Sequence, residues 1–257
     1  MGYNRYFDAD LIYGLKLSDI FIYKGYFGGG WTTTYTNEID GLQFSDETVI
    51  NPAITLAVAR AQLAGVNSTT KGYFGGGTTG TNSSEIDGIQ FSDETAINPA
   101  AILSVARYFL AGVNSSTKGY FAGGTTGTPS SEIDGLEFSN ETAINPAATL
   151  AVARYHLTGV NSSTKGYFAG GTTGTPSSEI DGIEFSNETA INPAAILAAR
   201  STLAGINSLS RGYFAGGTPG ALAATIDGIQ FSDETAISPA ITLSVGRREL
   251  AGIQWGY

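Results

Sequence analysis

Apolar residues recur along the chain in short clusters, which Gly-, Ser-, Thr- and Asn-rich turns separate. The clearest cluster is Gly-Tyr-Phe followed by a run of small residues that ends on Gly-Gly, and it comes directly after a Lys or Arg. The steps between successive copies are 47, 47, 47 and 46 residues. A period of this length with short, turn-bounded apolar runs predicts a β-rich repeat architecture, and propellers lead the candidates. The copies open at Gly25, Gly72, Gly119, Gly166 and Gly212.

The third copy, residues 119–165, shows the elements that each repeat predicts. Residues 119–124 form a strand that ends on two glycines, where positive φ angles and a close backbone approach are allowed. Residues 132–138 form the next strand. An Asp-Gly pair inside this strand predicts a β-bulge at residues 134–135, which would turn the neighbouring apolar side chains to one side.

Two further strands complete the repeat. Residues 143–153 contain Pro146, which fits only an edge strand or the start of a strand, so this segment is predicted to be the outer strand. Residues 154–160 alternate between polar and apolar positions and predict the inner strand. Four antiparallel strands in each period describe a propeller blade.

The chain is therefore predicted to be all-β, a five-bladed β-propeller of four-stranded antiparallel blades. A β-solenoid needs coils of about 20–30 residues and parallel pairing, and is the weaker alternative. Residues 1–24 stand outside the repeats as an N-terminal arm, and residues 25–257 form the propeller. The five repeats span 25–71, 72–118, 119–165, 166–211 and 212–257.

The phase of the repeats predicts how the ring closes. The first repeat begins with a second strand, whereas residues 247–254 match the inner strands of the other copies. We therefore expect the C-terminal strand to complete the N-terminal blade, which removes an exposed edge. Residues 17–23 are an alternative source of this inner strand.

The N-terminal arm is the most aromatic and aliphatic part of the chain. A segment of this kind does not stay in water alone. It is expected either to pack on the repeats or to dock on another subunit.

Two resemblances follow from the order of these motifs. One order of motifs resembles the Kelch repeat: Arg154 with apolar neighbours, then the sequence at 166–171, then Ile-Asp-Gly-Ile-Glu-Phe at 180–185. Kelch blades carry an aromatic residue before a Gly-Gly pair and an acidic residue on the third strand, and the resemblance implies a propeller that binds proteins. The Trp that is typical of the outer Kelch strand is absent. The repeats are also similar to repeats in bacteriophage and cyanobacterial open reading frames.

Composition limits the possible partners. The chain of 257 residues has a net charge of −10, so nucleic acid and anionic membranes are not expected partners. It contains no cysteine, no apolar run long enough to cross a membrane and no recognisable signal peptide, so cytoplasmic synthesis and no membrane insertion are expected. The array allows a homo-oligomer.

The single histidine, His156, is the first candidate for chemistry. A general base needs a partner that orients it, and the sequence offers none. The other copies carry different residues at this position, so we expect a surface side chain and no catalytic residue, cofactor or metal. The equivalent residues are Gln62, Phe109, Thr202 and Glu249.

Two sets of charged residues, one of aspartates and one of arginines, each recur at a fixed position of the repeat. The aspartates are expected to accept backbone N–H bonds at the predicted bulges, with a ring of cation ligands as the alternative. The arginines are expected near the central channel, paired with the aspartates between blades, with an anion-binding ring as the alternative. The sets are Asp40, Asp87, Asp134, Asp181 and Asp227, and Arg60, Arg107, Arg154, Arg200 and Arg247.

The repeats differ most in the loop after Gly-Gly and just after the crossover from outer to inner strand, which should emerge on one face. Aromatic residues on loops of a rigid scaffold commonly bind sugars or proteins. The candidates are Trp31, Tyr35, Tyr108, Phe109, Tyr155 and His156.

These observations predict a non-enzymatic structural and binding propeller. We expect a bacteriophage virion component (tail, fibre or capsid-associated) that attaches to other virion proteins through residues 1–24 and contacts a host-surface glycan or protein. It would be made in the host cytoplasm and located in the virion. One alternative is a cytoplasmic bacterial Kelch-like interaction scaffold. A glycan-active enzyme is less favoured, because such an enzyme needs two carboxylates in unlike environments, whereas the carboxylates of this chain occur in five like environments.

Overall fold

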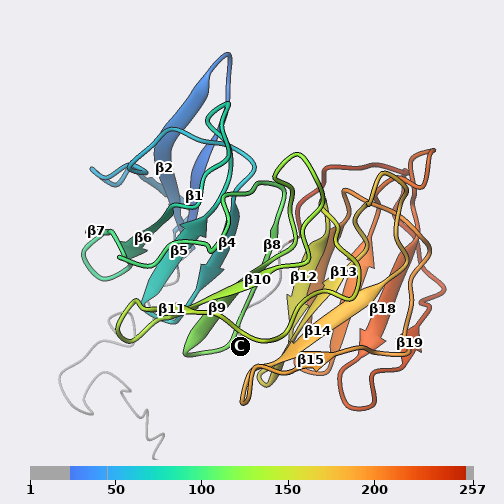
Figure 1. Cartoon of the computed structure of the whole chain (residues 1–257). Helices are drawn as coiled ribbons and strands as arrows, with labels where there is room; N and C mark the ends of the chain where they lie inside the picture. Colours follow the sequence, from blue (N-terminus) through green and yellow to red (C-terminus); the bar gives the residue numbers. More distant parts are fainter. Residues whose placement is uncertain (1–23, 45, 253–257) are drawn as a thin grey trace, which may run out of the picture.

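The computed structural model of the chain describes residues 24–44 and 46–252 (Figure 1). The predicted arm up to residue 23, the alternative inner strand at 17–23 and the end of the predicted C-terminal strand lie outside these residues.

The described residues form β-strands and connecting segments, without a helix. The strands make one three-stranded and four four-stranded antiparallel sheets, each in simple chain order. The all-β class is confirmed, and so is the four-stranded antiparallel arrangement in four of the five sheets. Sheet 1 contains β1 (Lys24–Trp31), β2 (Tyr35–Gln43) and β3 (Thr48–Ile50). Sheet 2 contains β4 (Ala64–Asn67), β5 (Lys71–Gly75), β6 (Ile86–Gln90) and β7 (Ala96–Ile97). Sheet 3 contains β8 (Ala111–Asn114), β9 (Lys118–Ala122), β10 (Ile133–Glu137) and β11 (Ala143–Ile144). Sheet 4 contains β12 (Thr158–Asn161), β13 (Lys165–Ala169), β14 (Ile180–Glu184) and β15 (Ala190–Ile191). Sheet 5 contains β16 (Ala204–Asn207), β17 (Arg211–Ala215), β18 (Ile226–Gln230) and β19 (Ala236–Ile237).

The sheets follow one another in chain order, and their first strands β4, β8, β12 and β16 are neighbours in succession (Figure 1). Sheets 1 and 5 lie on opposite sides of the molecule in this view. Sheet 1 lacks an inner strand, and within the described range β1 pairs only with β2. Closure of the ring by the C-terminal strand therefore stays a prediction.

The Gly-Gly pairs behave as the sequence predicts. Gly123 and Gly124 have φ angles of 66° and 94°, and the amide of Gly124 donates to the carbonyl of Arg154 in the next sheet at 3.0 Å. A Cβ atom on Gly123 would lie 2.6 Å from that same carbonyl oxygen. Glycine is required here both for its positive φ and for the close approach of the next sheet.

The predicted bulge is wrong. β10 pairs with β9 in unbroken register from Ile133 opposite Ala122 to Glu137 opposite Lys118. Both faces of β10 are buried, because sheets pack against it from either side, so its apolar residues need not face one side. The Asp-Gly pair has a different cause, since Asp134 is buried as the partner of an arginine.

The outer and inner strands are shorter than predicted. β11 ends at Ile144, because Pro146 soon follows and has no N–H to donate to a sheet. The connection to the inner strand is irregular, and it buries Ala148 and Leu150. β12 begins only at Thr158, since His156 has a φ angle of 57°, which is incompatible with a strand.

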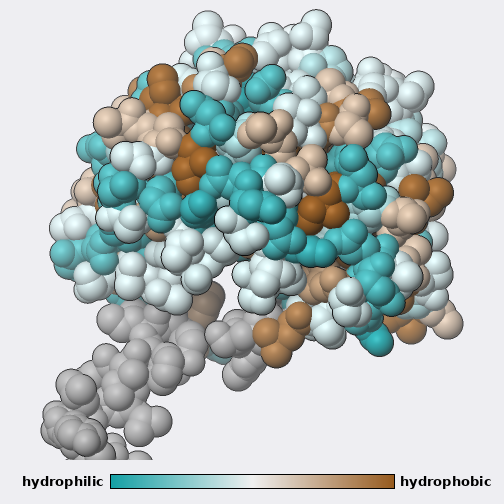
Figure 2. All heavy atoms as spheres, turned by 60° about the horizontal axis from the view of Figure 1, so that its bottom comes forward, coloured by the Kyte–Doolittle hydropathy of each residue, from teal (hydrophilic) through white to brown (hydrophobic). Residues whose placement is uncertain are grey.

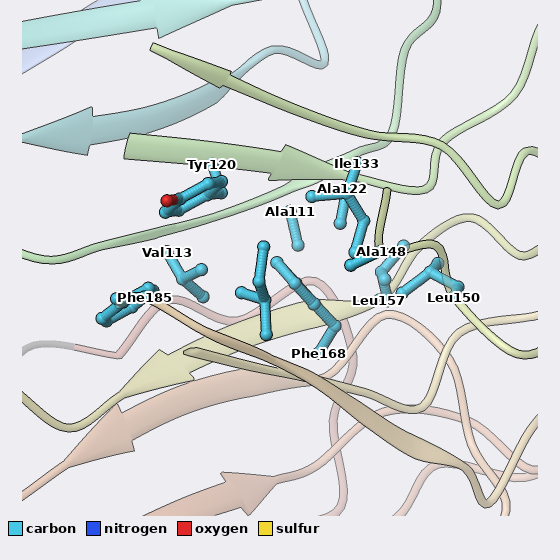
Figure 3. Packing of buried hydrophobic residues seen from close by; sticks show 11 residues of the cluster. Ala111, Val113, Tyr120, Ala122, Ile133, Ala148, Leu150, Leu157, Phe168 and Phe185 are labelled. Atoms are coloured by element: carbon cyan, nitrogen blue, oxygen red, sulfur yellow. The ribbon is translucent and has the colours of Figure 1, made fainter. Parts of the chain in front are cut away.

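The core lies between neighbouring sheets rather than inside one. Tyr120 of β9 and Phe185, which follows β14, stack with their ring centroids 5.6 Å apart and their planes at 3°, and Val113 of β8 lies nearby (Figure 3). Phe168 of β13 enters the same cluster. Each sheet therefore depends on its neighbour to bury its apolar face, as in other repeat proteins.

Buried ion pairs tie each complete sheet together. Arg154 has a fully buried side chain, and its Nη1 lies 2.5 Å from Oδ2 of Asp181. Its Nε donates to the carbonyl of Gly170 at 2.7 Å, and its Nη2 donates to that of Phe168 at 3.1 Å. Asp181 also accepts the backbone N–H of Ala151 at 3.1 Å. The remaining pairs are Arg60–Asp87, Arg107–Asp134 and Arg200–Asp227.

The surface is mixed in polarity. Figure 2 shows apolar side chains as separate patches among polar ones on the face that it brings forward. Within the described residues, no helix is long and apolar enough to span a membrane.

Candidate functional site

One position in each repeat lines a cavity of about 190 Å³, which we call the central pocket. This position comes just after the buried arginine and just before the inner strand. A ladder of backbone hydrogen bonds connects the copies, with each amide donating to the carbonyl of the previous copy at 3.0–3.1 Å. The residues of the ladder are Gln62, Phe109, His156, Thr202 and Glu249, and Leu63, Leu110, Leu157 and Leu203 form the rest of the wall.

The backbone at this position is strained in every copy. All five ladder residues have φ angles between 56° and 62°, the left-handed region that non-glycine residues rarely adopt. None of them is glycine, although the chain contains 35 glycines. The cost is about 1–2 kcal/mol for a residue with a side chain. The repeat thus holds five different side chains at the cavity at an energetic cost that glycine would avoid.

Aromatic rings gather beside the ladder. The ring of Phe109 lies 3.7 Å from that of His156 and 4.9 Å from that of Tyr108, measured between centroids. Tyr155 lies 5.1 Å from His156 and 6.3 Å from Phe109. The structure therefore brings four of the predicted binding residues together, and all four side chains are partly exposed.

The other two predicted aromatics form a second cavity. Trp31 and Tyr35 pack edge to face with centroids 4.6 Å apart, and they line a space of about 310 Å³ with Ala61 and Gln62. We call this space the Trp31 pocket. Gln62 lines both cavities, so the two adjoin at that side chain.

The crossover and the loop after Gly-Gly lie together, as the sequence predicts. Tyr108 bridges to Thr125, and Tyr155 bridges to Thr172, in the loops that follow the Gly-Gly pairs. The loop aromatics thus share a face with the ladder, and the positions at which the repeats differ most are concentrated there.

The electrostatics of the central pocket centre on His156. Burial lowers the pKa of the imidazole below its usual value of 6.5, and the carboxylate of Glu249 opposes this shift. The ring is therefore neutral at pH 7 and offers one N–H donor and one nitrogen acceptor. Together with an amide, a hydroxyl and a carboxylate, it gives the pocket polar groups of several kinds beside aromatic faces.

The aspartates and arginines mostly lie away from this pocket, in the core. The predicted pairing of the two sets is found, but it joins residues of one sheet rather than of neighbouring sheets. The guanidinium groups of Arg60, Arg107, Arg154 and Arg200 are buried against these carboxylates, so those four do not form an anion-binding ring. Among the described residues, no cluster of His, Asp and Glu could hold a metal ion, so the aspartates form no ring of cation ligands there. Asp40 and Arg247 differ from the rest because both are exposed and neither takes part in such an ion pair.

Sequence reasoning did not select three of the five ladder residues as binding residues. Gln62, Thr202 and Glu249 lack the aromatic character that identified the other candidates. The signal that could have found them is their equivalence to His156 in the repeat. Variation at one position of a regular repeat indicates a lack of constraint on the side chain only, because the backbone at this position has nearly the same φ angle in every copy.

Comparisons with known proteins do not narrow the assignment, since neither a known protein family nor a curated protein matches the chain.

Proposed function

We propose that the chain is a non-enzymatic binding protein, a five-bladed propeller of Kelch-like repeats whose central and Trp31 pockets bind a glycan on a host surface. The setting we propose is the virion of a bacteriophage, with residues 1–24 attaching the protein to other virion proteins. An acidic, cysteine-free array of turn-rich repeats with an apolar arm supports this setting.

The observation that carries the proposal is the ladder of five strained, non-identical residues around one cavity. Residues that hold the sheets together are nearly the same in every copy, because each junction has the same geometry. A position that points into a cavity and carries a different side chain in every copy is better explained by a ligand than by the scaffold.

A glycan suits the chemistry of the two pockets. Aromatic faces stack on the apolar faces of sugar rings, and hydroxyl groups need both donors and acceptors. The aromatic faces come from Phe109 in the central pocket and from Trp31 and Tyr35 in the Trp31 pocket. Donors and acceptors come from Gln62 and the neutral imidazole of His156. The net charge of −10 favours a neutral or cationic glycan over a polyanionic one.

The finer architecture belongs to the same proposal. The five sheets are blades around a hub, and residues 247–254 supply the inner strand that sheet 1 lacks. The first strands of sheets 2–5, which succeed one another as neighbours, support this arrangement.

The test is a screen of the purified protein on a glycan array, followed by calorimetry with the best ligand. We expect F109A and W31A each to weaken binding at least tenfold, because a buried aromatic contact contributes about 1.5 kcal/mol or more. L209A is the matched control, since Leu209 is 71% exposed and lies in a turn outside both pockets. Binding that F109A and W31A leave at the level of L209A, or no glycan binding at all, would contradict the proposal.

A further inference from the structure

Each sheet is joined to the next by one set of contacts, which we call a junction. A Lys at the start of the second strand in one sheet forms an ion pair with a Glu in the turn before the outer strand of the next sheet. The four pairs have N–O separations of 2.5–2.6 Å and are partly buried. They are Lys24–Glu94, Lys71–Glu141, Lys118–Glu188 and Lys165–Glu234.

An aromatic stack accompanies each ion pair. The Tyr two residues after the Lys stacks on a Phe of the next sheet, with centroids 5.4–5.6 Å apart. Its hydroxyl also donates to the Glu of the ion pair at 3.2–3.4 Å. Burial and the nearby Glu94 carboxylate raise the pKa of Tyr26 to about 12. The stacks are Tyr26–Phe91, Tyr73–Phe138, Tyr120–Phe185 and Tyr167–Phe231.

Sheet 1 presents one half of a fifth junction, which we call the leading face. It consists of Phe27, Phe44 and Glu47, which correspond to the residues that receive the previous sheet in the other copies. Phe44 is 54% exposed, whereas the corresponding Phe138 is 5% exposed. Phe27 is 71% exposed, whereas the corresponding Phe121 is fully buried against the previous sheet.

Sheet 5 presents the other half, the trailing face, which consists of Ile206, Arg211 and Tyr213. Arg211 stands where the other copies have the Lys of the ion pair, and Tyr213 stands where they have the stacking Tyr. Ile206 is 40% exposed, whereas the corresponding Val160 is 2% exposed against the next sheet. The cation of the trailing face and the carboxylate of the leading face complement each other in charge.

The last described residues already follow the path of an inner strand on the trailing face. The carbonyl of Arg247 accepts the amide of Gly217 at 2.8 Å, as the other arginine carbonyls do for their Gly-Gly pairs. A Cβ atom on Gly252 would lie 2.6 Å from the carbonyl oxygen of Gly205, as found at the equivalent glycines in the other inner strands. Arg247 is thus in position to pair with a third-strand aspartate, and Asp40 is the aspartate of the set that pairs with no arginine within the described part of the chain.

We propose that the leading and trailing faces of one chain form a fifth junction, in which Arg211 pairs with Glu47, Tyr213 stacks on Phe44 and Arg247 pairs with Asp40. This inference rests on the propeller proposed above and names the contacts that close it. The two faces lie apart in the structure, on sheets 1 and 5 at opposite sides of the view (Figure 1).

Two physical reasons favour the same chain over a second copy. Both faces belong to one chain, so the effective concentration of one face at the other is about millimolar. In dilute solution, the concentration of a second copy of the chain is lower. A head-to-tail pair of copies would also leave one leading and one trailing face uncovered, and such contacts continue into filaments unless a ring forms. Closure within one chain covers every exposed junction residue.

The test uses paired cysteines and a short bis-maleimide, because the chain contains no cysteine of its own. The double variant R211C/E47C probes the fifth junction. The matched control is K118C/E188C, which lies at an existing junction and replaces side chains that are 24% and 23% exposed. We expect the probe to give a cross-linked monomer in the same yield as the control, with the linked peptide confirmed by mass spectrometry.

Two other results would overturn the inference. A cross-linked dimer would show that a second copy covers the faces, and no product under conditions where the control reacts would show that the faces stay apart.

A second measurement needs no cross-link. G205A is expected to lower the thermal midpoint, because its Cβ would lie 2.7 Å from the Gly159 carbonyl oxygen. Among the described residues, a Cβ atom on Gly65 would meet nothing closer than 3.9 Å. An equal loss for G65A therefore supports closure, and an unchanged midpoint contradicts it. Neither measurement needs a glycan, so failure of the binding proposal leaves both results interpretable.

Discussion

The buried ion pair between Arg154 and Asp181 offers a direct test of what holds each sheet together. The change D181N keeps the shape of the side chain and removes its charge, which leaves the guanidinium of Arg154 buried without a counter-charge. Both side chains are at most 3% exposed, and the closest N–O separation is 2.5 Å. Removing one partner of such a pair lowers the free energy of unfolding by about 3–5 kcal/mol. This is a large share of the free energy of unfolding of a typical domain, which is about 5–15 kcal/mol.

Urea denaturation followed by tryptophan fluorescence and circular dichroism measures this loss. The matched control is D93N, because the exposed Asp93 lies in a turn where two other repeats already carry Asn140 and Asn187. Those asparagines accept the same hydrogen bonds, from the amide and hydroxyl of the Thr two residues later. We expect a lower midpoint for D181N and an unchanged midpoint for D93N. A midpoint for D181N equal to that of D93N would falsify the view that the pair stabilises the sheet.

Replacing both partners separates the charge from the packing. In R154M/D181L no charge is left unpaired in the core, so this double variant should be more stable than D181N alone. If the double variant were the less stable of the two, the hydrogen bonds from the guanidinium to the carbonyls of Gly170 and Phe168 would outweigh the ion pair.

The remaining predictions concern pH and the N-terminal arm. The single His156 gives one imidazole signal in NMR, and its titration midpoint should lie below 6.5, because burial disfavours the charged ring. Since the unfolded chain then binds more protons just below pH 6.5, the contribution of His156 to stability falls as the pH drops through this range, and a midpoint at or above 6.5 contradicts this account. Deletion of residues 1–23 should leave the melting temperature of the repeats unchanged while abolishing incorporation into particles, and unaltered incorporation would count against a role of the arm in attachment.

The sequence predicts the parts of the fold that depend on local chemistry. Gly-Gly pairs such as Gly123-Gly124 have positive φ angles, and the segment that contains Pro146 supplies the edge strand β11; both follow from the covalent structure of the residues themselves. The 47-residue step likewise fixes the strand order, because each copy repeats the same turns. Predictions of this kind need no knowledge of which sheets touch.

Features that depend on contacts between sheets were not predictable in the same way. The pattern around Asp134 predicts a bulge only if β10 has a single apolar face, whereas neighbouring sheets bury both of its faces. The positive φ angle of Phe109 is also not predictable from the sequence, since bulky residues rarely adopt that region. Its cause is the backbone ladder with Gln62 and His156, which forms only when the sheets lie side by side.

The central pocket and the proposed fifth junction are linked through one short segment. Glu249 lines the pocket, while Arg247 and Gly252 on either side of it belong to the inner strand that would complete sheet 1. Closure of the ring would therefore fix the position of the only carboxylate in the ladder. Any ligand that binds the closed form more tightly than the open one stabilises closure by the same factor. Binding in the pocket and cross-linking at the junction should consequently rise together, because both depend on where residues 247–252 lie.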